Sequence, residues 1–213
     1  MEAFVKVGRT KIFKNLFPQF VDRLKKELEG CKTVLDLGCG PNSPIQYCSV
    51  YSVGVELFEP YIRDSRKAKI HNEYILGDIR KIEFRPKSFG CVLGLEVLEH
   101  LTKKEGYELI KKMEIIAKRK IIISTPNGFL PQEEHDSNKL QIHKSGWTVD
   151  EFKNLGYKVE GIGGLKILRK GEKTEFKYGP RILNLIFSNL TQKITYRFPR
   201  LAFELFAVKK LGN

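Results

Sequence analysis

The chain has 213 residues, of which 41% are hydrophobic and 30% charged, a composition typical of one globular domain. Its four cysteines show no Cys-x-x-Cys pairing, which argues against a zinc site or a disulfide framework and favours reduced thiols in a cytosolic protein. The N-terminus lacks the apolar region of a signal peptide, and Gly, Pro, Ser and Asn interrupt the longest uncharged run, Leu37 to Val55. We therefore expect a single cytoplasmic domain over residues 1–213 with no membrane span.

The charge balance is the unusual bulk property, because the formal net charge is +13. Residues 169–213 contain ten Lys and Arg against three acidic residues. A basic surface of this kind attracts phosphate, either in RNA or on an anionic membrane to which the protein would bind peripherally. Solubility alone is the alternative explanation.

Secondary-structure signals alternate along the chain. Apolar residues at helical spacing before Gly30 predict an amphipathic helix in an N-terminal cap, residues 1–30. Short apolar runs predict seven strands, at 33–37, 51–56, 73–76, 89–95, 121–124, 157–167 and 201–209. Helices are expected at 60–69 and after two capping boxes, Thr102 with Glu105 and Thr148 with Glu151.

This alternation predicts an α/β fold, with a Rossmann-like, mostly parallel seven-stranded sheet and helices on both of its faces. We expect a cofactor-binding core over 31–168, a basic insertion over 169–200 and the last strand within 201–213. Two stretches interrupt the alternation, the polar segment 129–147 and the basic segment 170–200, and such insertions usually determine specificity.

A glycine-rich turn, Asp36-Leu37-Gly38-Cys39-Gly40, follows the first strand and lets backbone N–H groups approach a ligand. Glu56 ends the next strand at the spacing that suits a ribose diol, and Asp78 ends the third strand, where it can reach an adenine amino group. Together the three carboxylates predict a nucleoside cofactor. A dinucleotide is disfavoured, because Ser43 stands where the G-x-G-x-x-G pattern needs its third glycine.

At these residues the sequence resembles the class I S-adenosylmethionine (SAM)-dependent methyltransferases of the small-molecule and sugar type (methyltransferase-11-like). Val34 to Gly40 is similar to their first motif, Gly54-Val55-Glu56 to the second-strand acidic position, and Gly77-Asp78-Ile79 to the adenine-contacting position. Leu95 to Leu101 is similar to the segment after their fourth strand. The resemblance extends from about Thr33 to Ile167 and implies that the last strand is antiparallel.

The resemblance implies that the chain binds SAM and releases S-adenosylhomocysteine (SAH). Gly38 and Gly40 would pack against the methionine portion, Asp36 would order its amino group through water, and the backbone near Leu95 and Glu96 would hold the amine. Glu56 would bind both ribose hydroxyls, and Asp78 the adenine amino group. The implied cofactor-binding set is Asp36, Gly38, Cys39, Gly40, Glu56, Leu57, Asp78, Ile79, Leu95 and Glu96. One departure is Asn42, between Pro41 and Pro44, where the family often has a third glycine; it shortens the first helix.

Methyl transfer is an in-line displacement, so a base is needed only for a hydroxyl or protonated-amine acceptor. The candidate bases are His100, His135 and His143. Alternatives stay open for each: His100 is structural in many family members, His135-Asp136 is either an oriented pair or an exposed loop, and His143 serves either substrate or loop packing. His71 is expected to be solvated and Trp147 to be a core residue, and no metal site is predicted.

Thr125-Pro126-Asn127-Gly128 lacks the Asn/Asp-Pro-Pro-aromatic motif of base-modifying amino-methyltransferases. We therefore expect an oxygen acceptor on a small molecule, a sugar or a lipid-linked intermediate. An RNA or protein methyltransferase is the alternative enzyme, and a non-catalytic binding subunit with the cofactor fold is the alternative of another class. An apolar cluster around Ile182 to Leu190, flanked by basic residues, is compatible with ordinary packing, a homodimer face, a lid or an anionic membrane contact.

Overall fold

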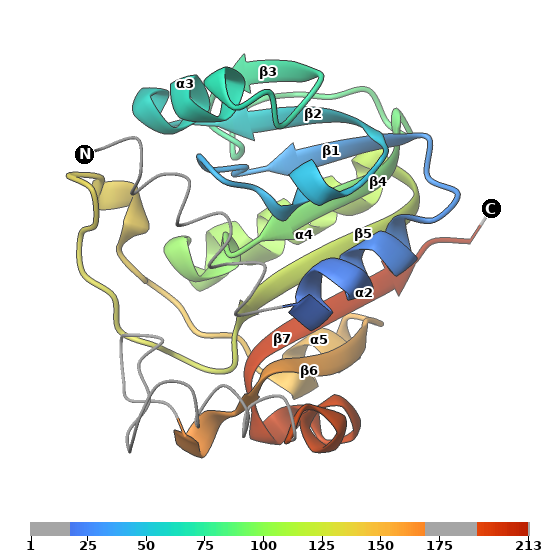
Figure 1. The fold of residues 1–213 in the computed structure, drawn as a ribbon, viewed down its shortest axis with the longest axis vertical. Coiled ribbons are helices and arrows are strands. Elements are labelled where there is room, and N and C mark those ends of the chain that lie inside the picture. Colours follow the sequence, from blue (N-terminus) through green and yellow to red (C-terminus); the bar gives the residue numbers. More distant parts are fainter. Residues whose placement is uncertain (1–17, 169–190, 213) are drawn as a thin grey trace.

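The computed structural model describes residues 18–168 and 191–212 of the chain. Seven strands form one sheet in the order β3-β2-β1-β4-β5-β7-β6 (Figure 1). The strands are β1 (Thr33–Leu37), β2 (Tyr51–Glu56), β3 (Glu73–Leu76), β4 (Phe89–Leu95), β5 (Ala117–Pro126), β6 (Lys158–Leu165) and β7 (Ala202–Lys210).

The strands from β3 to β5 pair in parallel, whereas β7 pairs antiparallel with both β5 and β6. The predicted fold class is therefore confirmed, including the reversed last strand. From β1 the chain adds β2 and β3 toward one edge of the sheet, and from β4, which lies beside β1, it adds strands toward the other edge. In open α/β sheets such a switch point leaves a crevice at the carboxyl ends of the strands, where ligands bind.

Helices cover both faces of the sheet (Figure 1). They are α2 (Pro18–Leu28), α3 (Glu59–Lys67), α4 (Lys103–Ile116) and α5 (Val149–Asn154), and residues 191–197 are also helical. Phe20, Leu24 and Leu28 of α2 pack on one face, and the buried residues of α4 and α5 pack on the other. Alternate residues of β1 and β4 belong to the two cores, as expected of strands buried on both sides.

Capping residues and prolines in the local sequence determine where most helices begin or end. Both predicted capping boxes form, Thr102 with Glu105 and Thr148 with Glu151. After β1 there is only a single 3₁₀ turn, η1 (Pro44–Tyr47), in agreement with the shortening expected from the two prolines. Further 3₁₀ turns are η2 (Leu98–His100), η3 (Lys139–Gln141), η4 (Lys166–Leu168) and η5 (Pro199–Leu201).

Two expectations for single residues have opposite outcomes. Trp147 is fully buried, as predicted for a core residue. His71 is not solvated: it is 6% exposed and packs over Gly54, whose missing side chain leaves room for the imidazole ring.

Several predictions fall on residues 1–17 and 169–190, outside the described part of the chain. They include the first half of the N-terminal cap and the apolar cluster of residues 182–190 with its homodimer, lid and membrane alternatives. In the described ranges, no helix has the length and hydropathy needed to span a bilayer.

Candidate cofactor and acceptor site

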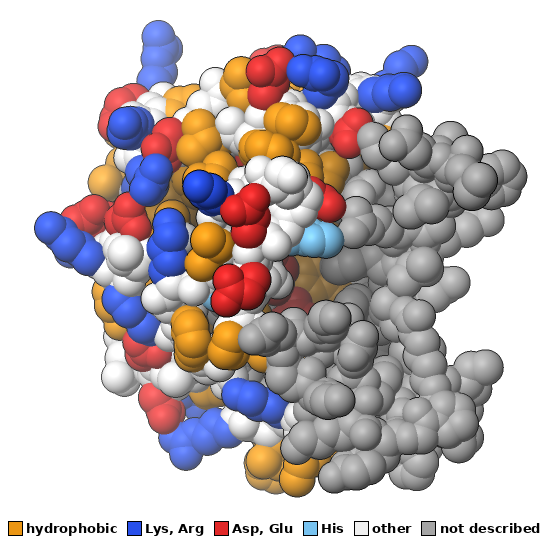
Figure 2. Space-filling view, turned by 90° about the vertical axis from the view of Figure 1, so that its left-hand side faces the viewer, with side chains coloured by type: hydrophobic (Ala, Val, Ile, Leu, Met, Phe, Trp, Pro, Cys, Tyr) orange, Lys and Arg blue, Asp and Glu red, His pale blue; other side chains and the backbone are white. Residues whose placement is uncertain are grey.

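Two adjoining cavities lie at the carboxyl ends of β1, β2 and β4, at the switch point of the sheet. Both are lined by Gly38, Glu56, Glu96 and Gln141. The first cavity is also lined by Leu57, Asp78, Ile79, Arg80, Val97, His100, Leu101, Leu140 and Lys144. The second extends past Cys39, Gly40, Tyr61, Leu95 and Ser124 to His135 and Asp136. Figure 2 shows a recess on this face of the molecule, with acidic side chains and a histidine near it.

The glycine turn lines the two cavities on the side that faces the sheet. Gly38 and Gly40 have φ values of +70° and +57°, which side chains disfavour. A Cβ atom on Gly38 would lie 2.7 Å from Cγ2 of Val97, whereas a Cβ atom on Gly40 would meet no atom within 4 Å. Gly38 is therefore required by packing, and Gly40 keeps the second cavity open for a ligand.

The Glu56 carboxylate is held at the end of β2 by three backbone N–H groups. Leu57 and Phe58 each donate to Oε1 at 2.8 Å, and Gly40 donates to Oε2 at 3.0 Å. A carboxylate has about four acceptor positions, so one on Oε2 remains for a ligand hydroxyl. Burial raises the pKa of Glu56 despite these bonds, so a hydroxyl donor would stabilise the charged form.

Asp78 lines the first cavity but already has a partner. Nε of Arg80 donates to Oδ1 at 2.9 Å, and Nη2 donates to Oδ2 at 2.8 Å. These bonds lower the pKa of Asp78, and the same guanidinium donates to Glu105 Oε1 at 2.7 Å. Arg80 therefore keeps Asp78 charged and orients it at the cavity wall.

Asp36 lies beneath the turn and lines neither cavity. Its carboxylate accepts a hydrogen bond of 2.6 Å from Ser43 Oγ and lies 3.6 Å from Nε2 of the buried His71. Burial raises the pKa of Asp36 to about 7 and lowers that of His71 to about 4. In this arrangement Asp36 supports the turn from below and has no direct path to a ligand.

His135 and Asp136 form the outer wall of the second cavity, with His135 exposed to solvent. Nε2 of His135 lies 3.7 Å from Oδ1 of Asp136, and the Tyr61 hydroxyl donates to Oδ2 of the same carboxylate at 3.0 Å. His135 and Asp136 therefore lie side by side on an exposed loop, and both sequence-based alternatives stay open.

His100 and His143 lie against each other with ring centroids 4.8 Å apart, and only His100 lines a cavity. Burial lowers the pKa of His100 to about 4 and also lowers the pKa of His143. The two rings are thus neutral at neutral pH. Each can still accept a proton, but both are weak bases.

The structure places nine of the ten predicted cofactor residues on the two cavities, with Asp36 as the exception. It also adds Arg80, Tyr61, Gln141 and Lys144, which the sequence patterns did not single out. The role of Arg80 could have been predicted from the sequence, since an Arg two residues after an Asp can fold back and pair with its carboxylate. The other three reach the site only through the tertiary fold.

Comparisons with known proteins point in one direction. Residues 35–120 match the family model described as a methyltransferase domain. No match was found among curated protein sequences. A SAM-dependent methyltransferase from Archaeoglobus fulgidus superposes with a TM-score of 0.57 at 19% identity, covering 94% of this chain and 98% of that chain.

Two further structures are similar to this chain. The plantazolicin methyltransferase BpumL in complex with SAH has a TM-score of 0.59 at 16% identity and covers 97% of this chain and 89% of its own. The small RNA methyltransferase HEN1 has a TM-score of 0.60 at 19% identity, covering 92% of this chain and 25% of that one. The family match covers residues 35–120, and the solved structures, all below 25% identity, show that the chain shares the fold of these methyltransferases.

Proposed function

We propose that the protein transfers a methyl group from SAM to an oxygen of a small molecule, a sugar or a lipid-linked intermediate. One observation carries the cofactor part of this proposal. Glu56, Asp78 and the glycine turn, predicted from three separate segments of the chain, border one continuous pair of cavities at the switch point.

The residues present fit the cofactor. Gly40 leaves the second cavity open where a side chain would intrude, and Glu56 retains an acceptor position for a ribose hydroxyl. Ile79 offers an apolar surface in the first cavity beside Asp78, which suits an adenine ring. When bound, SAM supplies an activated methyl group on a sulfonium.

The acceptor part rests on the polar end of the second cavity. Ser124, His135 and Asp136 line it, and these groups can hydrogen-bond a hydroxyl and orient it. The His135 ring, held beside Asp136, is the candidate to take the hydroxyl proton as the new carbon–oxygen bond forms.

Isothermal titration calorimetry with SAM and SAH tests the cofactor part. Glu56→Ala is expected to weaken binding at least tenfold, because it removes a charged acceptor that three N–H groups hold in place. Glu59→Ala is the matched control, since Glu59 is an exposed carboxylate on α3 paired with Arg63. Absence of SAM binding to the unaltered chain would overturn the proposal, and equal affinity in Glu56→Ala would refute the ribose contact.

The net charge of +13 favours RNA as the second candidate acceptor. Structures of bacterial Hen1 methyltransferase domains and of the small RNA methyltransferase HEN1 are among the structural neighbours. Transfer of labelled methyl groups from SAM separates the two candidates: label in an RNA fraction supports RNA, and label in an organic-soluble or sugar fraction supports the first proposal.

A further inference from the structure

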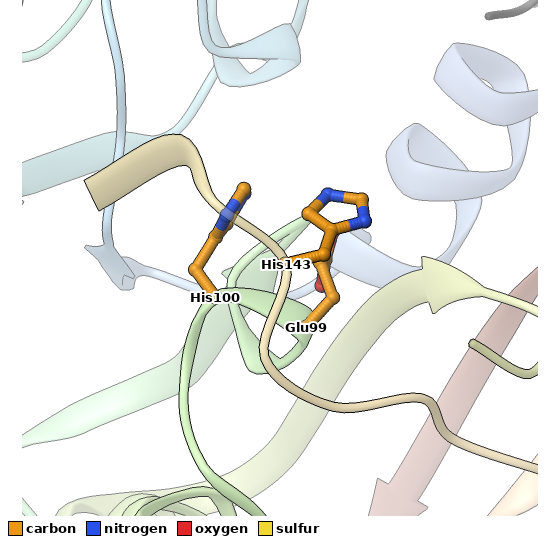
Figure 3. Close-up of side chains that lie close together, drawn as sticks. All are labelled: Glu99, His100 and His143. Atoms are coloured by element: carbon orange, nitrogen blue, oxygen red, sulfur yellow. The ribbon is translucent and has the colours of Figure 1, made fainter. Parts of the chain in front are cut away.

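Glu99, His100 and His143 form a compact cluster next to the first cavity. Glu99 and His100 come from the turn η2 after β4, and His143 comes from the loop that precedes α5 (Figure 3). One ligand atom from each of the three side chains lies within 4.8 Å of the other two. The cluster therefore joins two segments that are far apart in the sequence.

The Glu99 carboxylate is held in place with one oxygen unused. Thr125 Oγ1 donates to Oε2 at 3.0 Å, whereas Oε1 has no hydrogen-bond partner in the described part of the chain. Glu99 is only 2% exposed, so water does not easily compensate this oxygen. An unpartnered buried carboxylate oxygen costs free energy unless a cation or donor satisfies it.

The His143 ring is oriented in the manner of a metal ligand. Nδ1 of His143 lies 2.5 Å from the carbonyl oxygen of Leu130, and a carbonyl can only accept, so Nδ1 carries the proton and Nε2 keeps its lone pair. A backbone carbonyl in this role is typical of a histidine that binds a metal through its other nitrogen. Nδ1 of His100 makes no hydrogen bond within the described ranges, although the carbonyls of Gln141 and Ile142 lie near the ring.

Charge in this region is also unbalanced. The carboxylate of Glu96 lies close enough to that of Glu99 for their negative charges to repel each other. A cation between these groups would relieve the repulsion. Lys144 also lines the first cavity, near His100.

We infer that Glu99, His100 and His143 bind a divalent transition-metal ion. Two imidazoles and a carboxylate suit Mn²⁺, Fe²⁺, Co²⁺ or Zn²⁺ better than Mg²⁺ or Ca²⁺, which prefer oxygen ligands alone. Three donors at about 2.1 Å from one ion lie about 3.4–3.6 Å apart in tetrahedral or trigonal geometry, so a pair near the 4.8 Å limit must approach by more than about 1 Å. Binding of the ion therefore requires side-chain rotations that bring the three donors together.

The role of the ion rests on the proposed function. His100 lines the first cavity and Glu96 lines both, so the ion would border the ligand site. A metal-bound hydroxyl loses its proton more readily than a free one. The ion would therefore bind the acceptor oxygen where the two cavities adjoin and make its proton easier for His135 to remove.

Titration of tag-free, chelator-treated protein with Mn²⁺, followed by calorimetry, tests the inference. We expect one ion per chain, and at least tenfold weaker binding in Glu99→Gln, His100→Asn and His143→Asn. His135→Asn is the matched control, because this exposed histidine is on the same loop as His143 but outside the cluster. Failure to bind Mn²⁺, or unchanged affinity in all three variants, would overturn the inference.

A second measurement needs no substitution and so does not depend on whether the variants fold. Pulsed electron paramagnetic resonance of the unaltered chain with one equivalent of Mn²⁺ should show couplings to two imidazole nitrogens. Their absence would overturn the inference. SAM titration of the metal-free protein separates the two proposals: SAM binding without Mn²⁺ binding refutes only the metal site, and Mn²⁺ binding without SAM binding refutes only the proposed function.

Discussion

The two glycines of the turn after β1 should respond differently to the same substitution. Gly38→Ala places a Cβ atom 2.7 Å from Val97 Cγ2 at a φ of +70°. The left-handed backbone costs about 1–2 kcal/mol for a residue with a side chain, and the overpacking costs about 1–3 kcal/mol more. Gly40→Ala meets no atom within 4 Å, so only the backbone cost, about 1 kcal/mol, applies.

For SAM affinity, unlike stability, Gly40→Ala is the more informative substitution. The new methyl group of Gly40→Ala points into open space at the second cavity, where we place the methionine portion of SAM. We expect at least a tenfold loss of SAM affinity, about 1.4 kcal/mol, in a variant that remains folded. Urea unfolding monitors stability, and calorimetry with SAM monitors affinity.

A double-mutant cycle isolates the clash. Val97→Ala combined with Gly38→Ala removes the methyl group that the new Cβ would meet, so the double variant should be more stable than the sum of the single changes predicts. Equal destabilisation by Gly38→Ala and Gly40→Ala, or unchanged SAM affinity in Gly40→Ala, would refute the assigned geometry of the turn.

Two further predictions concern the interior. Asp36→Asn should stabilise the protein at pH 8: the folded-state pKa of about 7 lies above the ordinary 3.8, so stability falls as pH rises between these values, by up to about 4 kcal/mol. Urea unfolding at pH 8 and pH 4 checks this, and the gain should vanish near pH 4; a gain independent of pH would exclude the buried charge as its cause. Gly106→Ala would place a Cβ atom 2.4 Å from Cζ2 of the fully buried Trp147, so we expect a net loss of about 2 kcal/mol despite the better helix propensity of alanine. Fluorescence of Trp147, the single tryptophan, follows the unfolding, and an increase in stability would contradict the packing described.

The fold was predictable because its signals are local. Strands buried on both faces have continuous apolar runs, and the capping boxes mark where α4 and α5 begin. Glu56 and Asp78 were found for the same reason, since each directly follows or ends a strand at a known edge of a parallel sheet.

The errors came from contacts between distant segments. His71 lies in a polar stretch, and only Gly54 on the neighbouring strand makes room for its ring. The hydrogen bond that Ser43 donates to the Asp36 carboxylate beneath the turn was not predicted, because Ser43 was considered only as the position of a missing glycine. The approach of Glu99 to His143 was not predicted either, because the two residues are far apart in sequence and only the loop before α5 brings them together.

The position of β7 has a consequence for how the chain folds. β7 lies between β5 and β6, so pairs such as Pro126 with Glu204 join residues that are far apart in sequence. Non-local pairing of this kind slows folding, because a long loop must close before any hydrogen bond forms. During synthesis on the ribosome, β5 and β6 therefore wait with unpaired edges until β7 emerges, and this interval is when we expect the nascent protein to be most prone to aggregate.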